Sequence, residues 1–493
     1  MELPTAIPDA QVECTQLFIN GAFVNASSGK TFPALNPANN KKLADVQEAS
    51  PADVDKAVAA ARAAFKPGSP WRRMDAAQRG RLLNKLADLV ERDIAYLASL
   101  ECLNNGKPYQ FAVGDVHSAI NFLRYNAGIA DKIHGRTIPV NGDFFCYTRY
   151  EPVGVCGQIL PWNFPLMLTC MKLSAAIAAG CTVVIKPAEQ TPLTALYLAK
   201  LTVAAGFPNG VINVVTGYGN VGAAISGHMD INKVSFTGST EVGQLIQQAA
   251  GKSNCKRVTL ETGGKSPLVI AEDADLDQAA LIAHNGLMFN AGQCCIAASR
   301  LFVHESVYEE FCKKSVELAK KRTVGCPFKC LDQGPQIDKE QTDKIMELIE
   351  SGKKEGARLL CGGGKIPGPS DLYVQPTVFA DVTDNMRIAK EEIFGPVQQI
   401  LKYKTLDEAI ERANQTHYGL AAGIVSKNVD TIQKFAQNIL AGTVWVNTYA
   451  VVAPQTPFGG FKMSGMGREN GVEGVLAYCE VKTVTMALPE KLS

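Results

Sequence analysis

Apolar residues recur at helical spacing in the first part of the chain. A capping box at residues 50–53, with proline at the first helical position, precedes apolar residues that share one helical face: Val54, Val58, Ala61 and Phe65. A second helix is predicted from about Asp75 to Asn105, where glycine and proline follow. We therefore predict that this first part is helical.

The pattern changes near residue 150. Short β-branched segments then alternate with helical ones: VGVCGQIL, CTVVIK, VINVVTG, KVSFTG and RVTLE. Near-continuous apolar strands separated by helices indicate a parallel sheet that is buried on both faces. The alternation resumes beyond residue 265 with PLVIA, SRLFV and GTVWVN and with helices near 276–289 and 305–321. We therefore expect two α/β domains.

The segment TIPVNGDFFCYTRYEPVG, residues 137–154, differs from both domains. Strand-like runs flank Asn141 and Gly142, a dipeptide that is typical of a hairpin turn. A projecting hairpin of this kind often pairs with another subunit, and a plain surface hairpin fits the pattern equally well.

Composition narrows the choice of function. The chain has 493 residues, which favours two or three domains. Its formal net charge of +1 argues against nucleic acid or an anionic membrane as a partner. No apolar window is long enough to span a bilayer, and the first residues lack the pattern of a signal peptide. The 14 cysteines include no CxxC pair and histidines number six. We expect a cytoplasmic protein with reduced thiols and without a metal site.

Three loops after predicted strands have nucleotide-binding character. The stretch 217–222 matches G-x-G-x-x-G between a strand and a helix, although the acidic residue that usually follows is missing and a plain tight turn explains it equally well. Ser239 begins a helix after a second strand, and Lys186 and Glu189 follow a third. A glutamate that accepts ribose hydroxyls would repel a 2′-phosphate. Together the loops favour a dinucleotide more than any one of them does.

The stretch FNAGQCCIAASR, residues 289–300, carries the candidate nucleophile. Its paired cysteines lie where a predicted helix ends, a position at which a thiolate can be accessible and reactive. Two small apolar residues at the end of a buried helix would have the same sequence. Glu261 ends a strand before two glycines, and a buried carboxyl there would have a raised pKa and suit a general base.

Seven motifs occur in an order that resembles the aldehyde dehydrogenase superfamily, specifically the cytosolic class that includes retinal dehydrogenases. They are PWNFP (161–165), KPAEQTP (186–192), FTGSTEVG (236–243), LETGGKSP (260–267), GQCCIAASR (292–300), KEEIFGPV (390–397) and PFGGFKMSGMGRE (457–469). The resemblance covers nearly the whole chain. It implies NAD-dependent oxidation of an aldehyde to a carboxylic acid through a cysteine thiohemiacetal and a thioester.

The resemblance also implies a role for each matching residue. Cys295 matches the nucleophile, Glu261 the general base, and Asn163 the side chain that stabilises the oxyanion together with the backbone N–H of the nucleophile. Lys172 and Glu469 match supporting positions, Glu469 in a proton path. The candidate NAD-binding residues are Glu392 and Phe394 at the nicotinamide ribose, Lys186 and Glu189 at the adenosine ribose, Gly238 and Ser239 at the pyrophosphate, and in addition Trp162 and Gly219.

The implied architecture has three parts. Residues 1–129 and 153–263 are expected to form a Rossmann-type, parallel-sheet NAD-binding domain, and residues 264–463 an α/β catalytic domain. Residues 130–152 and 464–493 are expected to form a small β oligomerisation element. The family resemblance implies a homotetramer built as a dimer of dimers.

Several positions depart from the family pattern. Met171 replaces an aromatic wall of the substrate tunnel, Ser174, Ala175 and Thr262 are unusual, and the 217–222 loop is one residue shorter than in close relatives. These changes leave the chemical groups intact but bear on NAD affinity and on the choice of aldehyde, which the sequence does not identify. Two alternatives stay open: an eye-lens crystallin of the omega type, derived from an aldehyde dehydrogenase and with little or no activity, and a cysteine-dependent hydrolase that does not use NAD.

Overall fold

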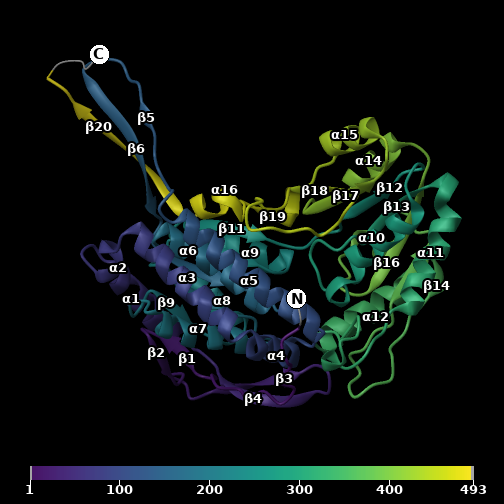
Figure 1. The fold of residues 1–493 in the computed structure, drawn as a ribbon, viewed down its shortest axis with the longest axis horizontal. Coiled ribbons are helices and arrows are strands. Elements are labelled where there is room, and N and C mark those ends of the chain that lie inside the picture. The colour runs from purple at the N-terminus through teal and green to yellow at the C-terminus, as the bar shows by residue number, and fades with distance from the viewer. Residues whose placement is uncertain (1–2, 490–493) are drawn as a thin grey trace.

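The computed structural model describes residues 3–489 as two lobes and a projecting arm (Figure 1). An eight-stranded sheet with helices on its faces forms one lobe, and a seven-stranded sheet forms the other. The arm is a three-stranded sheet that extends away from the first lobe. The fold is of the α/β class, as the alternation of strands and helices predicted.

The eight-stranded sheet has the order β19-β11-β10-β7-β8-β9-β1-β2. Its strands are β1 (Leu17–Ile19), β2 (Ala22–Val24), β7 (Val155–Ile159), β8 (Thr182–Lys186), β9 (Ile212–Val214), β10 (Lys233–Thr237), β11 (Arg257–Glu261) and β19 (Gly465–Met466). The five central strands, β7 to β11, are parallel to one another, and they are the five strands that the sequence predicted. Their carboxyl ends therefore lie along one edge of the sheet.

The seven-stranded sheet has the order β14-β15-β16-β13-β12-β17-β18 and is parallel except for β14. Its strands are β12 (Pro267–Ile270), β13 (Arg300–His304), β14 (Arg358–Cys361), β15 (Thr377–Ala380), β16 (Val397–Tyr403), β17 (Ala421–Val425) and β18 (Thr443–Val446). The predicted strands β12, β13 and β18 are confirmed here. A short two-stranded sheet, β3 (Thr31–Asn36) and β4 (Lys41–Gln47), completes the body.

Helices pack on both sheets. Those of the first lobe are α1 (Pro51–Phe65), α2 (Pro70–Arg73), α3 (Ala76–Arg92), α4 (Ile94–Asn105), α5 (Tyr109–Ile129), α6 (Pro165–Ala179), α7 (Leu193–Ala205), α8 (Gly219–Gly227), α9 (Thr240–Lys252) and α16 (Gly471–Leu476). Those of the second are α10 (Leu276–Met288), α11 (Tyr308–Lys321), α12 (Lys339–Lys354), α13 (Arg387–Lys390), α14 (Leu406–Asn414) and α15 (Val429–Asn438). Four 3₁₀ helices are η1 (Phe289–Gly292), η2 (Glu305–Val307), η3 (Pro327–Lys329) and η4 (Lys462–Ser464).

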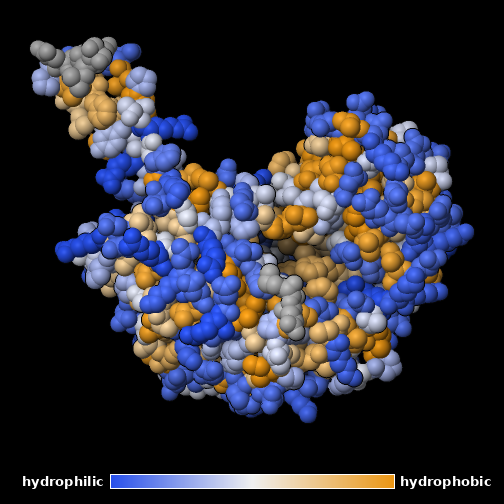
Figure 2. Space-filling model, viewed as in Figure 1, coloured by the Kyte–Doolittle hydropathy of each residue, from blue (hydrophilic) through white to orange (hydrophobic). Residues whose placement is uncertain are grey.

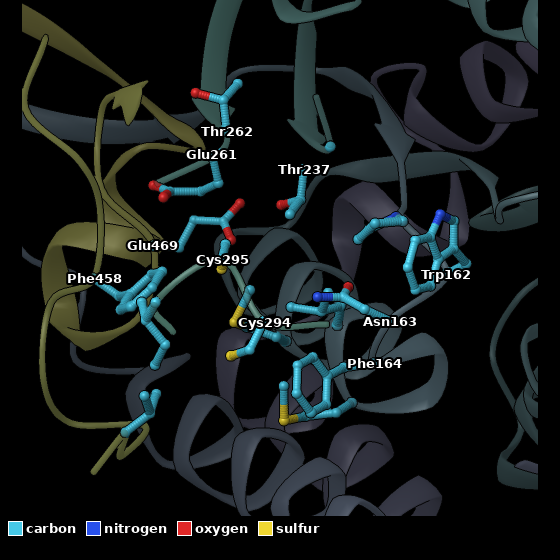
Figure 3. A pocket seen from close by; sticks show the side chains of 18 of the residues that line it. Trp162, Asn163, Phe164, Thr237, Glu261, Thr262, Cys294, Cys295, Phe458 and Glu469 are labelled. Carbon is cyan, nitrogen blue, oxygen red and sulfur yellow. The ribbon is translucent and has the colours of Figure 1, made fainter. Parts of the chain in front are cut away.

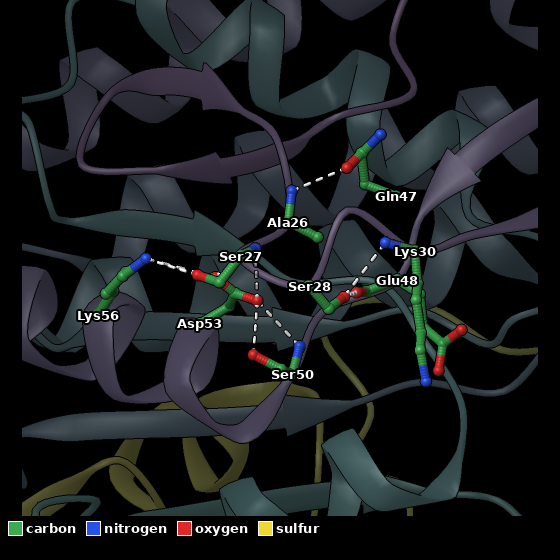
Figure 4. A network of polar contacts seen from close by, with 9 residues as sticks. All are labelled: Ala26, Ser27, Ser28, Lys30, Gln47, Glu48, Ser50, Asp53 and Lys56. Atoms are coloured by element: carbon green, nitrogen blue, oxygen red, sulfur yellow. Dashed lines mark hydrogen bonds and ion pairs between the residues drawn. The ribbon is translucent and has the colours of Figure 1, made fainter.

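The predicted start of α1 is confirmed by its hydrogen bonds (Figure 4). The Asp53 carboxylate accepts from the backbone N–H and the hydroxyl of Ser50, at 2.9 and 2.8 Å, and from the backbone N–H of Ser27 at 3.1 Å. Burial by itself would raise the pKa of Asp53, but these donors lower it. The capped helix buries Val54 and Val58 against β7, β8 and β9.

The prediction of a wholly helical first part is wrong between residues 17 and 47, where four strands form. In β3 the side chains alternate between exposed and buried, a period of two that a search for helical spacing does not detect. The single helix predicted from Asp75 to Asn105 is also two helices, because Asp93 interrupts it with φ −98° and ψ 20°. The Asp93 carboxylate then accepts a hydrogen bond from Tyr197.

The predicted hairpin is confirmed in the arm. Strands β5 (Thr137–Ile138) and β6 (Phe144–Pro152) are antiparallel, and β20 (Cys479–Ala487) pairs with β6 along its whole length. Within the body, β19 pairs with β11, and α16 packs on α6. Residues 1–2 and 490–493, which belong to the predicted NAD-binding and oligomerisation segments, lie outside the described residues.

Candidate active site

A cavity of about 390 Å³ lies at the carboxyl ends of the central strands of the first lobe, between the two lobes. Figure 2 shows the molecule hollowed there. Residues that follow β7, β10 and β11 line the cavity from one lobe, and the loops before β13 and β16 line it from the other. Nine of the predicted site residues line this one cavity: Trp162, Asn163, Gly238, Ser239, Glu261, Cys295, Glu392, Phe394 and Glu469. Lys186, Glu189 and Gly219 do not line it.

The candidate nucleophile follows a strained loop at the end of α10. Asn290, Ala291 and Gly292 have φ of 51°, 56° and 75°, in the left-handed region. This reversal brings Cys294 and Cys295 to the cavity wall. Cys294 is buried, whereas Cys295 is partly exposed, so the cavity reaches the second sulfur of the pair more readily than the first.

The surroundings of Cys295 favour the neutral thiol in the protein alone. Its contact with the Cys294 thiol, together with burial and the nearby Glu392 and Glu261 carboxyls, raises its pKa well above the usual range. A base that accepts its proton is therefore needed before or during attack on a substrate.

Glu261 ends β11 and is the candidate for such a base. Both of its carboxylate oxygens are buried and have no hydrogen-bond partner among the residues that the structure describes. Burial and the neighbouring Glu469 carboxyl raise its pKa well above the ordinary value, against a smaller effect of the Lys172 ammonium. In Figure 3, Cys295 lies between the Glu261 and Asn163 side chains.

Lys172 and Glu469 form a buried ion pair next to Glu261. The Lys172 ammonium also donates to the Ser235 hydroxyl at 3.0 Å, and that hydroxyl donates to the Glu469 carboxylate at 2.9 Å. Three polar side chains from α6, β10 and the segment before α16 thus meet behind the candidate base. The lysine charge compensates that of Glu469, so that Glu261 is not left beside an unpaired carboxylate.

Asn163 is held by polar groups from two other segments. Its side-chain N–H donates to the backbone oxygen of Gln293 at 3.2 Å. Its own backbone oxygen accepts from Lys107 Nζ at 3.0 Å and from Asn290 Nδ2 at 3.1 Å. The Asn290 amide also donates to the Gln293 oxygen, at 3.2 Å. Asn163 and the Cys295 loop are therefore linked directly.

Trp162, Phe394 and Glu392 form another part of the cavity wall. The two rings meet edge to face with centroids 5.3 Å apart. The Glu392 carboxylate accepts from the backbone N–H of Gly264 at 3.0 Å, and burial raises its pKa to about 7. The other oxygen of this carboxylate suits a ribose hydroxyl, and the two aromatic rings suit a planar heterocycle.

The turn after β10 fits a phosphate group. Gly238 and Ser239 line the cavity, and Ser239 caps α9, whose free N–H groups and dipole favour an anion. Thr237 also lines the cavity, and its buried hydroxyl has no hydrogen-bond partner in the described part of the chain. A Cβ at Gly238 would lie 2.4 Å from the Phe236 ring, so this close turn requires glycine. These donors fit the pyrophosphate of a dinucleotide.

The remaining predicted cofactor residues form a neighbouring group outside the cavity. Lys186 Nζ lies 3.4 Å from the Glu189 carboxylate at the carboxyl end of β8. Gly219 begins α8, and a Cβ at Gly222 on the same helix would lie 3.7 Å from Lys186 Cδ, so α8 and this lysine are in contact. Since β8 is parallel to β7, these residues lie along the same sheet edge as the cavity.

Comparisons with known proteins identify the family. A model described as the aldehyde dehydrogenase family matches residues 23–484. The chain belongs to the aldehyde dehydrogenase family. It is 60% identical over 495 residues to aldehyde dehydrogenase 1A1 of Oryctolagus cuniculus, covering 100% of both chains, and 60% identical to that of Homo sapiens, covering 100% of this chain and 99% of the other. A solved NAD+ complex of aldehyde dehydrogenase from Bacillus cereus has a TM-score of 0.95 at 49% identity and covers 99% of each chain.

These matches confirm the resemblance and the fold that the seven motifs predicted. The departures from the family pattern in this aldehyde dehydrogenase fall in three groups, of which the 217–222 loop, at the start of α8, lies outside the cavity. Met171 and Thr262 line the cavity and so contribute to its shape. Ser174 and Ala175 are buried in α6 away from it, and the Ser174 hydroxyl accepts from Asn126 Nδ2 at 2.8 Å.

Three residues that belong to the site were missed by the sequence reasoning. Lys107 and Asn290 support Asn163, and the buried Asn470 lines the cavity beside Glu469. The only signal for Asn470 was its place directly after the last motif. Lys107 and Asn290 carry no motif signal of their own, because their contacts join segments that lie far apart in the sequence.

Proposed function

We propose that Cys295, Glu261 and Asn163 carry out the NAD-dependent oxidation of an aldehyde to a carboxylic acid. The observation that supports this most directly is their placement: residues from three distant segments line one cavity, whose other wall has the shape and donors of a dinucleotide site. Family membership supports the same reaction.

In the first step Cys295 Sγ attacks the carbonyl carbon of the aldehyde, and Glu261 accepts the thiol proton. The carbonyl oxygen gains negative charge as the carbon–sulfur bond forms. The Asn163 side-chain N–H and the Cys295 backbone N–H donate to it, a contribution of roughly 3–4 kcal/mol per donor to the barrier. The links of Asn163 to Asn290 and Gln293 hold this donor in place.

When NAD is bound, its nicotinamide ring accepts the hydrogen and the electron pair that leave this carbon. The acyl group then remains on Cys295 as a thioester. Glu261 then passes the thiol proton to solvent and removes a proton from a water molecule, whose oxygen attacks the acyl carbon. The carbon–sulfur bond breaks, the acid is released, and the Cys295 sulfur takes up the proton that Glu261 had removed from water. The raised pKa of Glu261 makes its carboxylate a stronger base for both proton transfers.

The test is the formation of NADH, followed by its absorbance, when the purified chain is mixed with NAD and a panel of short, aromatic and retinoid aldehydes. Turnover is expected for the wild type and its loss for Cys295→Ala, with Cys294→Ala as the matched control that keeps the nucleophile. Turnover that survives Cys295→Ala would assign the reaction to another residue. The relatives named above are enzymes, and they give no support to the lens-crystallin alternative.

We also propose the quaternary and domain organisation implied by the family. Residues 1–129 and 153–263 bind NAD, residues 264–463 complete the catalytic site, and residues 130–152 and 464–493 form the oligomerisation element of a homotetramer. Exposed apolar side chains on the arm support an interface there: Phe144, Phe145, Val481 and Met486. Light scattering at micromolar concentration is expected to give a tetramer, and a monomer would contradict the proposal.

We propose a cytoplasmic location for the chain, as its free cysteines suggest. Among the helices of residues 3–489, none has the length and apolarity to cross a membrane. Fractionation of cells that express the tagged chain tests the proposal, and recovery in an organelle would contradict it.

A further inference from the structure

Asn470 lies at the cavity wall, directly after Glu469 and before α16. The residue is 6% exposed, yet neither its Oδ1 nor its Nδ2 has a hydrogen-bond partner within residues 3–489. Buried amides are almost always paired, because an unpaired one costs about 1–3 kcal/mol. An amide that is kept buried and unpaired beside a cavity indicates a polar group that enters the cavity.

The backbone of Asn470 is strained and firmly held. Its φ of 58° and ψ of 175° lie in a region that is nearly restricted to glycine. Two hydrogen bonds of 2.7 Å join Glu469 to Phe458, and the Asn470 oxygen accepts from the Gly474 N–H at 2.8 Å. The fold therefore fixes this amide at the cavity wall. Because the backbone is held by these hydrogen bonds, mobility of the segment does not explain why the amide is unpaired.

Most of the substrate side of the cavity is apolar. Its wall includes Phe164, Met167, Leu168, Met171, Ile296 and Phe458. A purely apolar aldehyde would match these side chains and leave the Asn470 amide unpaired. A substrate with one suitably placed polar group would match both, and a site that hydrogen-bonds such a group discriminates strongly against an analogue that lacks it.

The chemistry of the amide and its neighbours selects the polar group. Asn470 offers an acceptor oxygen and a donor NH2 group, and a single hydroxyl group can both donate to Oδ1 and accept from Nδ2. A carboxylate would leave Oδ1 unpaired and would be repelled by the Glu261 and Glu469 carboxyls. An ammonium group would leave Nδ2 unpaired.

We propose that Asn470 is a specificity-determining residue that favours aldehydes with a hydroxyl group over their deoxy analogues. This inference rests on the proposed function, since it concerns the substrate of the same site. The same amide chemistry would also suit the water that hydrolyses the thioester, so the experiment must separate a substrate hydroxyl from a water molecule.

The test compares wild type and Asn470→Leu, with NAD, on matched aldehyde pairs: 3-hydroxybutanal with butanal, and 4-hydroxyphenylacetaldehyde with phenylacetaldehyde. The ratio of kcat/KM for the hydroxylated to the deoxy aldehyde is expected to fall about 10- to 100-fold in the variant for at least one pair. Met171→Leu is the matched control: it alters the wall without a hydrogen-bonding group, and its ratio is expected to stay at the wild-type value.

Two results would overturn the inference. One is an unchanged ratio for every pair. The other is an equal fall of kcat for both members of each pair together with a rapid burst of NADH, because slow hydrolysis of the thioester would assign the amide to water. If the wild type oxidises no aldehyde at all, the proposed function itself fails, which is a different outcome from activity without selectivity.

Discussion

Replacing Asn290 with glycine tests whether the oxyanion donor is held in place by its neighbours. The Asn290 amide joins the Asn163 backbone to the Gln293 backbone, with N–O distances of 3.1 and 3.2 Å. Because φ at Asn290 is 51°, alanine would add backbone strain to the loss of the amide, whereas glycine adopts this conformation freely. Asn290→Gly therefore removes one of the two hydrogen-bonded links between the segments, leaves the Asn163–Gln293 bond, and changes little else.

The structure sets the size of the effect. Both acceptors keep one partner, since Lys107 still donates to the Asn163 oxygen at 3.0 Å and Asn163 still donates to the Gln293 oxygen at 3.2 Å. The variant loses two hydrogen bonds, but neither acceptor oxygen is left without a donor. We therefore expect the free energy of unfolding to fall by about 2 kcal/mol. Complete loss of an oxyanion donor lowers kcat by about 10²–10³-fold. A donor that is only displaced is expected to lower kcat about 10- to 100-fold with little change in KM.

Steady-state kinetics of the two single variants and the double variant with Asn163→Ala give the answer. If Asn290 acts through Asn163, its replacement adds little once Asn163 is alanine. Ala291→Gly is the control, because it changes the neighbouring left-handed residue without removing a hydrogen bond and is expected to keep kcat. Single effects that multiply in the double variant, or an unchanged kcat in Asn290→Gly, would refute the reasoning.

Three further predictions concern the charged groups of the site. Because the pKa of Glu261 is raised, its carboxyl group is protonated at low pH and becomes a base only as the pH rises. We therefore expect kcat to rise with pH, and Glu261→Gln should abolish this rise in a pH–rate profile. Glu189→Ser removes the carboxylate that would repel a 2′-phosphate, so kcat/KM with NADP relative to NAD should rise about tenfold, and an unchanged ratio would contradict this placement. Lys172→Met leaves Glu469 buried without its cation, and denaturant unfolding should show a loss of about 3–5 kcal/mol.

The central strands and their loops could be predicted from the sequence because their signal is local. Each of β7 to β11 is a short apolar run between helices, and the parallel arrangement follows from burial on both faces. The strands from residue 17 to 47 could not be found in the same way. β1 and β2 have three residues each and extend the sheet at its edge, and the half-exposed pattern of β2, β3 and β4 resembles that of surface loops.

The motifs predicted which side chains line the candidate site, but not the residues whose hydrogen bonds hold those side chains in position. Cys295 and Glu261 stand in sequences whose order is distinctive, and the cavity contains both. The hydrogen bonds of Lys107 and Asn290 to Asn163 span 56 and 127 residues of sequence. No local pattern indicates such contacts, because one joins distant segments of the first lobe and the other joins a segment of the second lobe to the first.

Backbone strain and unpaired polar atoms occur together in this aldehyde dehydrogenase at the cavity wall. Asn290 and Ala291 before the nucleophile, and Asn470 beside Glu469, have backbone conformations that cost about 1–3 kcal/mol each. The Glu261 oxygens and the Asn470 amide have no hydrogen-bond partner between residues 3 and 489. The packed sheets on either side hold these features in place. The free energy that the strained backbone and the unpaired atoms cost is therefore offset once, when the chain folds, and not again in each catalytic cycle. The same rigidity leaves the polar atoms of the wall free to bind what enters the cavity.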